Sequence, residues 1–500
     1  MNITASIHLD SHFTIGEVDR RLFGSFVEHL GRCVYTGIYE PGHPAADADG
    51  LRTDVLALIR ELGVTVVRYP GGNFVSGYRW EDSVGPAHAR PRRLDPAWRT
   101  IETNRFGLAE FISFTQAAGV EPMMAVNLGT RGMAEAAELI EYANHPADTA
   151  LSDLRREHGN ADPFGIRLWC LGNEMDGPWQ MGHKTADEYG RLAAETARLM
   201  RMIQPDVELV ACGSSHSSMP TFGEWETTVL SHAYDVVDYI SLHCYYDPNA
   251  YDLASFLASA QDLEAYIGSV IALCDAVKAR TRSSKTLRLS LDEWNVWSMS
   301  KVSQDMGEWR EAPRLLEDVY TAADAVVVGS LLITLLRHCD RVGAACLAQL
   351  VNVIAPIMTE PAGPAWRQTI FHPFAQAARY GHGTGLRLAI TSPQADTDRF
   401  GPVDLLHAAA VDGHDGWLTL FAVNRSTDSP LALTVDLGDF SATGPAQHSY
   451  VTDADPLAAN TVDAPDRITP RSGRQTQIHG RKLLVDLPTM SWNTVRIPIA

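Results

Sequence analysis

Short apolar runs recur along the first three quarters of the chain, with segments of helical periodicity between them. Eight of these runs have the length and composition of strands: residues 22–26, 64–68, 122–126, 167–171, 208–212, 239–242, 287–291 and 345–350. The gaps between them are long enough for a crossover helix. This alternation predicts an α/β protein built as a (β/α)8 TIM barrel. The alternative is a doubly wound sheet, which usually has fewer strands.

The segments between the runs carry signals for helix ends. Residues 51–62 place apolar side chains on one face of a helix, and Gly63 follows where a C-terminal cap is expected. Thr185 and Glu188 have the spacing of a capping box, which predicts that a helix begins after Thr185. Residues 325–336 are almost purely apolar. That length is too short to span a bilayer and predicts a buried helix.

The pattern changes after about residue 381. Short segments with a period of two replace the helical repeat, and Gly, Pro, Asp, Ser and Thr lie between them; the clearest are 417–423, 431–437, 482–487 and 494–499. They predict an all-β sandwich of jelly-roll type. Residues 3–9 alternate in the same way, and we expect this segment to pair with the C-terminal sheet. The predicted organisation is an N-terminal strand joining the sandwich (1–16), the barrel (17–380) and the C-terminal β-sandwich (381–500).

Composition narrows the class of protein. The 500 residues are 45% hydrophobic and 20% charged, which predicts a large core and argues against disorder. The formal net charge of −20 disfavours nucleic acid and anionic membranes as partners, because both are bound by basic patches. The N-terminus lacks the features of a secretory signal, and the seven cysteines are scattered without a Cys-x-x-Cys pair. These features predict a cytoplasmic protein with reduced thiols.

Neither a metal nor a cofactor is predicted. The histidines include no pair with the spacing and helical context of a zinc site. The glycine-rich segment 381–385 fails the spacings of phosphate-binding loops and lies where we expect a domain junction.

Two glutamates stand just past two of the apolar runs. Glu174 follows the fourth run and Glu293 follows the seventh. Functional residues of a barrel lie at the carboxyl ends of its strands, and strands four and seven face each other across the mouth. Such a pair suits glycoside hydrolysis, with one carboxyl as acid/base and the other as nucleophile or base. The sequence gives no separation, so retention and inversion both remain open; a separation of about 5 Å would mean retention.

The ends of two other runs bear on the second glutamate. Arg68 closes the second run, where its charge would keep Glu293 ionised by lowering the pKa of that carboxyl. His243 and Tyr245 end the sixth run, and the Tyr245 hydroxyl is placed to donate to Glu293. A single histidine at a strand end is more often a hydrogen-bonded structural residue than a ligand.

Further residues of the kind found in sugar sites lie close to the glutamates. Asn173 precedes Glu174 and offers hydrogen bonds to a sugar hydroxyl, while Trp179 and Trp297 follow the two glutamates and offer faces on which sugar rings stack. An isolated glutamate at a strand end is most often a surface carboxylate or an ion-pair partner. Two of them with matched surroundings favour a sugar-cleaving site.

Several long motifs resemble one family. Segments 22–31, 67–74, 124–130, 170–179 and 292–295 resemble the intracellular α-L-arabinofuranosidases of glycoside hydrolase family 51. The resemblance extends through residues 347–352 and continues weakly into the β domain at 491–493. It implies that Glu174 is the general acid/base and Glu293 the nucleophile of a retaining mechanism.

The resemblance also implies roles for other residues. The furanose hydroxyls would be held by Glu28, Asn73 and Asn173, and the exocyclic hydroxyl by Gln349. Tyr245 would orient Glu293, while Trp98 and Trp297 would border the sugar pocket or the leaving group. The implied activity is an exo-acting release of terminal non-reducing L-arabinofuranose from arabino- and arabinoxylo-oligosaccharides. Family members are commonly hexamers, so the resemblance implies a homo-oligomer.

Two alternatives remain. A β-xylosidase or an endo-β-glucanase on the same barrel would use nearly the same groups, and the shape of the site, a pocket or an open cleft, distinguishes them. A non-catalytic sugar-binding protein is the other alternative. The presence of Glu174 and Glu293 together with Asn173 and Arg68 argues against it.

Overall fold

A computed structural model describes residues 3–302, 307–473 and 476–500 of the chain. Eight parallel strands form a closed barrel, in which each strand lies beside its neighbours in sequence and the last pairs with the first. This confirms the predicted barrel and excludes the doubly wound sheet. The barrel strands are β3 (Gly24–Phe26), β4 (Val66–Tyr69), β7 (Glu121–Val126), β8 (Leu168–Leu171), β9 (Glu208–Ala211), β10 (Tyr239–Tyr246), β11 (Arg288–Val296) and β12 (Val342–Leu347).

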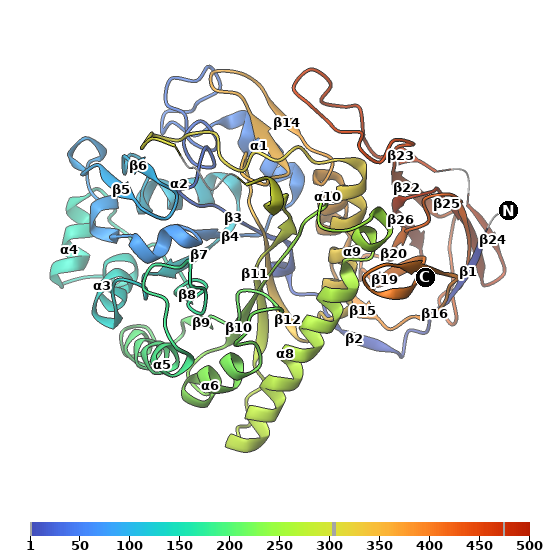
Figure 1. Cartoon of the computed structure of the whole chain (residues 1–500), viewed down its shortest axis with the longest axis horizontal. Coiled ribbons are helices and arrows are strands. Elements are labelled where there is room, and N and C mark those ends of the chain that lie inside the picture. Colours follow the sequence, from blue (N-terminus) through green and yellow to red (C-terminus); the bar gives the residue numbers. More distant parts are fainter. Residues whose placement is uncertain (1–2, 303–306, 474–475) are drawn as a thin grey trace.

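Helices connect the strands and surround the barrel (Figure 1). They are α1 (Thr53–Leu62), α2 (Leu108–Ala118), α3 (Met133–Asn144), α4 (Ala150–Glu157), α5 (Ala186–Ile203), α6 (Glu224–Ala233), α7 (Leu253–Leu257), α8 (Ala260–Thr281), α9 (Ala322–Arg337) and α10 (Phe371–Tyr380). Short 3-10 turns occur at η1 (Arg20–Phe23), η2 (Asn73–Gly77), η3 (Trp80–Ser83), η4 (Ala87–Ala89) and η5 (Met299–Lys301). Among the described residues, no helix combines the length and the apolar character needed to cross a membrane.

The predicted helix ends are present. α1 ends at Gly63, whose left-handed backbone (φ 80°) lets its N–H bond the Ile59 carbonyl. α5 begins after Thr185, whose side chain accepts from the Glu188 N–H while the Glu188 carboxylate accepts from the Thr185 N–H. Each pairing satisfies backbone groups that a helix end leaves without partners.

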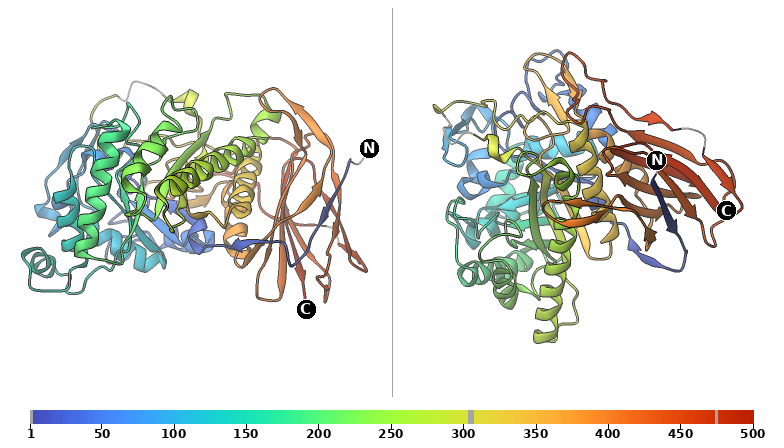
Figure 2. Two further views of the ribbon diagram at one scale, coloured as in Figure 1. Left: turned by 90° about the horizontal axis from the view of Figure 1, so that it is seen from below. Right: turned by 45° about the vertical axis from the view of Figure 1, so that its right-hand side comes forward.

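The apolar helix predicted at residues 325–336 is α9, which lies between the barrel and the β domain (Figures 1 and 2). Every residue from Ala322 to Leu336 is buried. Gly329 allows α9 to pack closely against β26, because a Cβ at this position would lie only 2.4 Å from the Trp492 ring. The helix is apolar all round because it packs on both domains.

The C-terminal domain is a sandwich of two sheets with an apolar core between them (Figure 2). One sheet has the order β16 (Ala389–Thr391), β1 (Ile3–His8), β21 (Leu431–Asp436), β25 (Lys482–Leu487) and β24 (Gln477–His479). The other has the order β2 (Thr14–Glu17), β15 (Thr384–Leu386), β19 (Leu406–Asp412), β20 (Trp417–Asn424), β26 (Ser491–Pro498), β22 (Gln447–Val451) and β23 (Arg471–Ser472).

The N-terminal strand belongs to this sandwich. β1 pairs in parallel with β21, with Ile3 opposite Leu431, and antiparallel with β16 on its other side. The expected pairing of residues 3–9 with the C-terminal sheet is therefore present, whereas the exact domain limits stay a prediction. Three small hairpins complete the chain: β5 (Arg93–Asp95) with β6 (Thr100–Glu102), β13 (Ile357–Thr359) with β14 (Ala365–Arg367), and β17 (Gln394–Thr397) with β18 (Gly401–Asp404).

Candidate active site

A β-bulge turns Glu293 into the barrel. β10 and β11 continue past residues 242 and 291, where the sequence-based prediction wrongly ended them. Ser241 lies opposite Ser290, but His243 lies opposite Glu293, so β11 contains one extra residue. Without that residue Glu293 would lie opposite Cys244, whose side chain is on the other face of the strand. The bulge therefore places Glu293 on the same face as His243.

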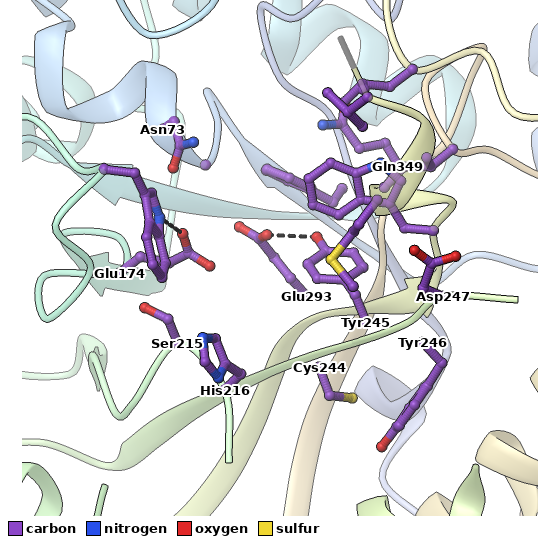
Figure 3. Close-up of a pocket in the computed structure, with 18 of the residues that line it drawn as sticks. Asn73, Glu174, Ser215, His216, Cys244, Tyr245, Tyr246, Asp247, Glu293 and Gln349 are labelled. Carbon is purple, nitrogen blue, oxygen red and sulfur yellow. Dashed lines mark hydrogen bonds between the residues drawn. The ribbon is translucent and has the colours of Figure 1, made fainter. Parts of the chain in front are cut away.

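The Glu293 carboxylate is held by two donors. Arg68 Nη1 donates to Oε1 over 2.8 Å. The Tyr245 hydroxyl donates to Oε2 over 2.7 Å (Figure 3). Burial raises the pKa of Glu293, but the charges of His243 and Arg68 and these hydrogen bonds outweigh burial and leave the pKa below its usual value. The carboxylate is therefore kept ionised, which is the form a nucleophile needs.

Arg68 connects the two halves of the site. It is buried in β4, and besides Glu293 it donates from Nη2 to the Asn173 side-chain oxygen over 2.7 Å. Its Nε lies 4.0 Å from an oxygen of Asp292. Asp292 and Glu293 are consecutive, and the bulge lets both approach the same cation. A buried guanidinium needs such partners to offset its lost hydration.

Glu174 follows β8 in a left-handed backbone conformation with φ 43°, which is uncommon for a residue with a side chain. Its Oε1 lies 3.0 Å from His243 Nδ1, and its Oε2 accepts a 2.6 Å hydrogen bond from the indole N–H of Trp179. One oxygen of Glu174, one of Glu293 and a ring nitrogen of His243 all lie within 4.8 Å of one another. Carboxylates from strands across the barrel thus meet at one point.

A second group of polar side chains gathers around Glu28. Its Oε1 accepts from the Trp98 indole over 2.9 Å, and its Oε2 accepts from the Gln349 side-chain nitrogen over 3.0 Å. Burial, and then the charge of Glu293, raise the pKa of Glu28 to about 8. The Oε1 atom of Gln349 is buried and has no hydrogen-bond partner among the described residues. A buried acceptor without a partner is costly, and a ligand hydroxyl would satisfy it.

Two further predicted residues lie at the edges of this group. Asn73 begins η2, and its side-chain oxygen is 3.5 Å from the Asn173 side-chain nitrogen. Trp297 packs edge-on against the Tyr245 ring, with 5.1 Å between ring centroids. The indole nitrogen of Trp297 is buried and, like the Gln349 oxygen, has no partner within the part of the chain that the structure describes.

These groups lie around a single cavity of about 610 Å³. Of the predicted site residues, nine line it: Glu28, Asn73, Trp98, Glu174, Trp179, Tyr245, Glu293, Trp297 and Gln349. The other three, Arg68, Asn173 and His243, lie behind the wall and hydrogen-bond to residues in it. The volume falls in the range of about 300–1,000 Å³ that is typical of small-molecule sites.

Some lining residues were missed by the sequence analysis. Ser215 and His216 follow β9, Tyr251 follows β10, and Arg399 comes from the β17–β18 hairpin. The polar segment directly after the fifth apolar run was an available signal for the first two. Loop length and tertiary packing place the other two, and no periodic pattern marks them.

Two groups of side chains among the described residues have the spacing to hold a metal ion: Asp10, His12 and Asp439 at the surface, and Glu174, His243 and Glu293 in the cavity. In the second group, Arg68 and Tyr245 already donate to Glu293. A cation there would be repelled by the guanidinium 2.8 Å from the same carboxylate. The arrangement is better suited to proton transfer and nucleophilic attack.

Comparisons with known proteins agree with this geometry. Residues 58–262 match the model of the α-L-arabinofuranosidase 1 domain, and residues 292–491 match that of the α-L-arabinofuranosidase C-terminal domain. An intracellular exo-α-(1→5)-L-arabinofuranosidase of Streptomyces lividans is 64% identical over 99% of this chain and 75% of its own length. One from Bacillus subtilis is 53% identical over 99% of each chain.

Solved structures give the same result. A family 51 α-L-arabinofuranosidase from Bifidobacterium longum superposes with a TM-score of 0.95 at 47% identity, covering 99% of this chain and 100% of that one. An α-L-arabinofuranosidase from Thermotoga maritima, solved as an arabinose complex, superposes with a TM-score of 0.88 at 32% identity, covering 99% of each chain. The chain belongs to the family 51 α-L-arabinofuranosidases.

Proposed function

We propose that the protein is a retaining, exo-acting α-L-arabinofuranosidase that releases terminal non-reducing L-arabinofuranose from arabino- and arabinoxylo-oligosaccharides. The observation that carries the proposal is the approach of Glu174 and Glu293 oxygens to within 4.8 Å. Retaining enzymes keep their carboxyl groups about 5–5.5 Å apart, whereas inverting enzymes need about 6.5–9.5 Å to admit a water between them.

The first step forms a covalent glycosyl-enzyme. Glu293 attacks the anomeric carbon while Glu174 gives its proton to the leaving oxygen as the glycosidic bond breaks. The hydrogen bonds from Arg68 and Tyr245 fix the direction of the attacking carboxylate. In the second step Glu174 takes a proton from water, the water oxygen attacks the same carbon, and Glu293 leaves. Two inversions give a product with the configuration of the substrate.

The group around Glu28 supports the exo mode. Trp98 and Gln349 donate hydrogen bonds to Glu28. These bonds join the turn between β5 and β6 and the loop after β12 to the loop after β3, across this part of the cavity. We assign Glu28, Asn73, Asn173 and Gln349 to the furanose hydroxyls, and Trp98 and Trp297 to the walls. The Gln349 oxygen without a partner supports this assignment. For linkage we propose α-(1→5), which the names of the Streptomyces lividans and Bacillus subtilis relatives carry.

Hydrolysis of 4-nitrophenyl α-L-arabinofuranoside, followed by proton NMR, tests the reaction. We expect α-L-arabinofuranose to appear first and to mutarotate later. If the β-anomer appears first, the double displacement is wrong. If the protein does not hydrolyse this substrate but cleaves an aryl β-xyloside or a β-glucan, the proposal is wrong and the protein is one of the alternative glycosidases. Arabinobioses of different linkage, used in the same assay, test the α-(1→5) preference.

Replacing Arg68 with glutamine is expected to move the acidic limb of the pH profile of kcat/KM upward. Arg68 lowers the pKa of Glu293, so without it the pKa rises and a higher pH is needed to ionise the nucleophile. A neighbouring cation typically shifts a carboxyl pKa by about 1–3 units, so a shift of about one pH unit or more is expected. Initial rates across the acidic range measure it. The exposed Arg481 is a matched control, and an unmoved limb in Arg68→Gln would contradict the electrostatic role.

We also propose that the protein acts in the cytoplasm as a homo-oligomer, a hexamer by family resemblance. The names of the Streptomyces and Bacillus relatives describe them as intracellular. Light scattering that gave the mass of a single 54.8 kDa chain would contradict the assembly.

A further inference from the structure

The cavity continues beyond the two glutamates over the loops that follow β9, β10 and β11. Its outer part is lined by His216, Tyr251, Met299 and Arg399, none of which contacts the Glu293 carboxylate. The whole cavity of about 610 Å³ is of the size that holds ligands of several rings. The part beyond Glu174 therefore has room for sugars of the leaving group.

The order of the barrel strands gives a route for the leaving group. β8, β9, β10 and β11 are neighbours, so the loops after them follow one another around the mouth. The leaving oxygen lies beside Glu174, after β8. The ring of His216, in the next loop, lies parallel to that of Trp179, with 6.1 Å between centroids. In Figure 3, Ser215 and His216 lie near Glu174, and Tyr246 and Asp247 lie on the other side of the Glu293–Tyr245 pair. An oligosaccharide leaving group that passes His216 next reaches the loop after β10.

At that point the β domain contributes a side chain to the cavity. Arg399, in the turn of the β17–β18 hairpin, donates its backbone N–H to the Ser255 hydroxyl over 3.1 Å. Its guanidinium lies 3.3 Å from an Asp262 carboxylate oxygen and 4.4 Å above the Tyr251 ring. Both distances lie within the reach of ion pairs and cation–π contacts. The hairpin is thus fixed on the barrel, and the guanidinium is held at the wall of the cavity.

The pair formed by Tyr251 and Arg399 retains unused binding capacity. The Tyr251 side chain is 43% exposed, and its hydroxyl has no hydrogen-bond partner among residues 3–302, 307–473 and 476–500. A guanidinium has five N–H donors, and the Arg399 side chain donates a hydrogen bond only to Asp262 among those residues. An aromatic face beside free donors suits a sugar ring with its hydroxyls. Asp247 and Asp262 in the same wall would repel an anionic ligand.

We propose that Tyr251 and Arg399 form a subsite for a neutral sugar residue of the leaving group, two or more residues beyond the bond that is cleaved. The β domain would then take part in substrate recognition through its β17–β18 hairpin. This inference rests on the proposed arabinofuranosidase function and names where its longer substrates are held.

The dependence of kcat/KM on substrate length tests the subsite. The probes are α-(1→5)-linked arabino-oligosaccharides of two to five residues, with 4-nitrophenyl α-L-arabinofuranoside as the substrate that cannot reach it. For the wild-type protein we expect kcat/KM to rise with length. Tyr251→Ala and Arg399→Ala are expected to lose about tenfold on the longest substrate, as a KM effect, and to match wild type on the aryl glycoside, because each removes a contact worth about 1.4 kcal/mol.

Controls separate this role from a structural one. Arg481→Ala removes an exposed arginine of the β domain and should leave the length dependence unchanged, as the thermal midpoint of each variant is monitored. If Arg399→Ala fails to fold, Tyr251→Ala alone decides, because Tyr251 is an exposed loop residue. Equal losses on short and long substrates, or a wild-type rate independent of length, would overturn the subsite. A wild-type protein inactive on the aryl glycoside would overturn the proposed function and the subsite with it.

Discussion

Replacing Glu293 with alanine is expected to lower kcat on 4-nitrophenyl α-L-arabinofuranoside by about 10⁴-fold or more, the scale on which loss of a covalent nucleophile acts. The bulge between β10 and β11 aims this carboxylate inward, and Arg68 and Tyr245 hold its two oxygens. Release of 4-nitrophenol measures the rate. Glu195→Ala, on the exposed face of α5, is the matched control.

Azide added to Glu293→Ala is expected to replace the missing nucleophile, and the configuration of the product should show this. In Glu293→Ala the small anion fits where the carboxylate was removed and attacks the anomeric carbon from that face. We therefore expect part of the turnover to return, with an arabinosyl azide of inverted configuration as product. A Glu293→Ala rate within tenfold of wild type, measured on protein with an unchanged thermal midpoint, would show that another group is the nucleophile.

The second large effect is expected for Glu174→Ala, and its size should depend on the leaving group. General acid catalysis contributes about 10²–10⁴-fold, so cleavage of arabinobiose should fall by that factor, because a sugar alkoxide leaves poorly without a proton. Formation of the glycosyl-enzyme from the 4-nitrophenyl substrate should be largely kept, since nitrophenolate leaves without help. Parallel kcat/KM measurements on the two substrates give the comparison.

The same variant should also use azide, with the opposite stereochemistry to Glu293→Ala. Azide enters from the face that water normally uses and attacks the glycosyl-enzyme, so the arabinosyl azide keeps the configuration of the substrate. An equal loss on both substrates would contradict the acid role. After such a result, His243 would be the next residue to test as the acid, because its Nδ1 lies 3.0 Å from Glu174 and 3.7 Å from Glu293.

The barrel was predictable because its strands are buried on both faces. Each then appears in the sequence as a short, nearly continuous apolar run. For example, all four residues of β8 and of β4 are buried, Arg68 included. Eight such runs predict the barrel, and the barrel geometry places Glu174 and Glu293 across one mouth. The general position of the site therefore followed from patterns that local sequence carries.

Contacts within the site were less accessible to sequence reasoning. His243 was associated with Tyr245 by proximity in sequence, but its ring nitrogen lies against Glu174. The prediction ended β10 and β11 where polar residues begin. In the structure the polar ends stay in the sheet, because Arg68, Tyr245 and the bulge satisfy the buried carboxylates. The sequence of one strand alone does not show that residues from other strands satisfy its buried carboxylates.

The β domain shows a similar limit. Its strands β21 and β25 alternate between buried and more exposed residues, as expected. β20 and β26 are buried along most of their length, because α9 packs against their sheet. β15, β16 and β23 have only two or three residues and no pattern to detect. Arg399 lies in the turn between β17 and β18, which have four residues each, and its place at the cavity depends on the docking of the hairpin on Ser255 and Asp262.

The position of β1 has a consequence for how the protein is made. Ile3 pairs with Leu431, so β1 meets its parallel partner only after 428 more residues have been added to the growing chain. At a translation rate of about 5–20 residues per second, that interval lasts roughly 20–90 s. The barrel strands, which end at Leu347, are complete before this partner exists. The five-stranded sheet can therefore form completely only after Leu487, the last residue of β25, has been synthesised.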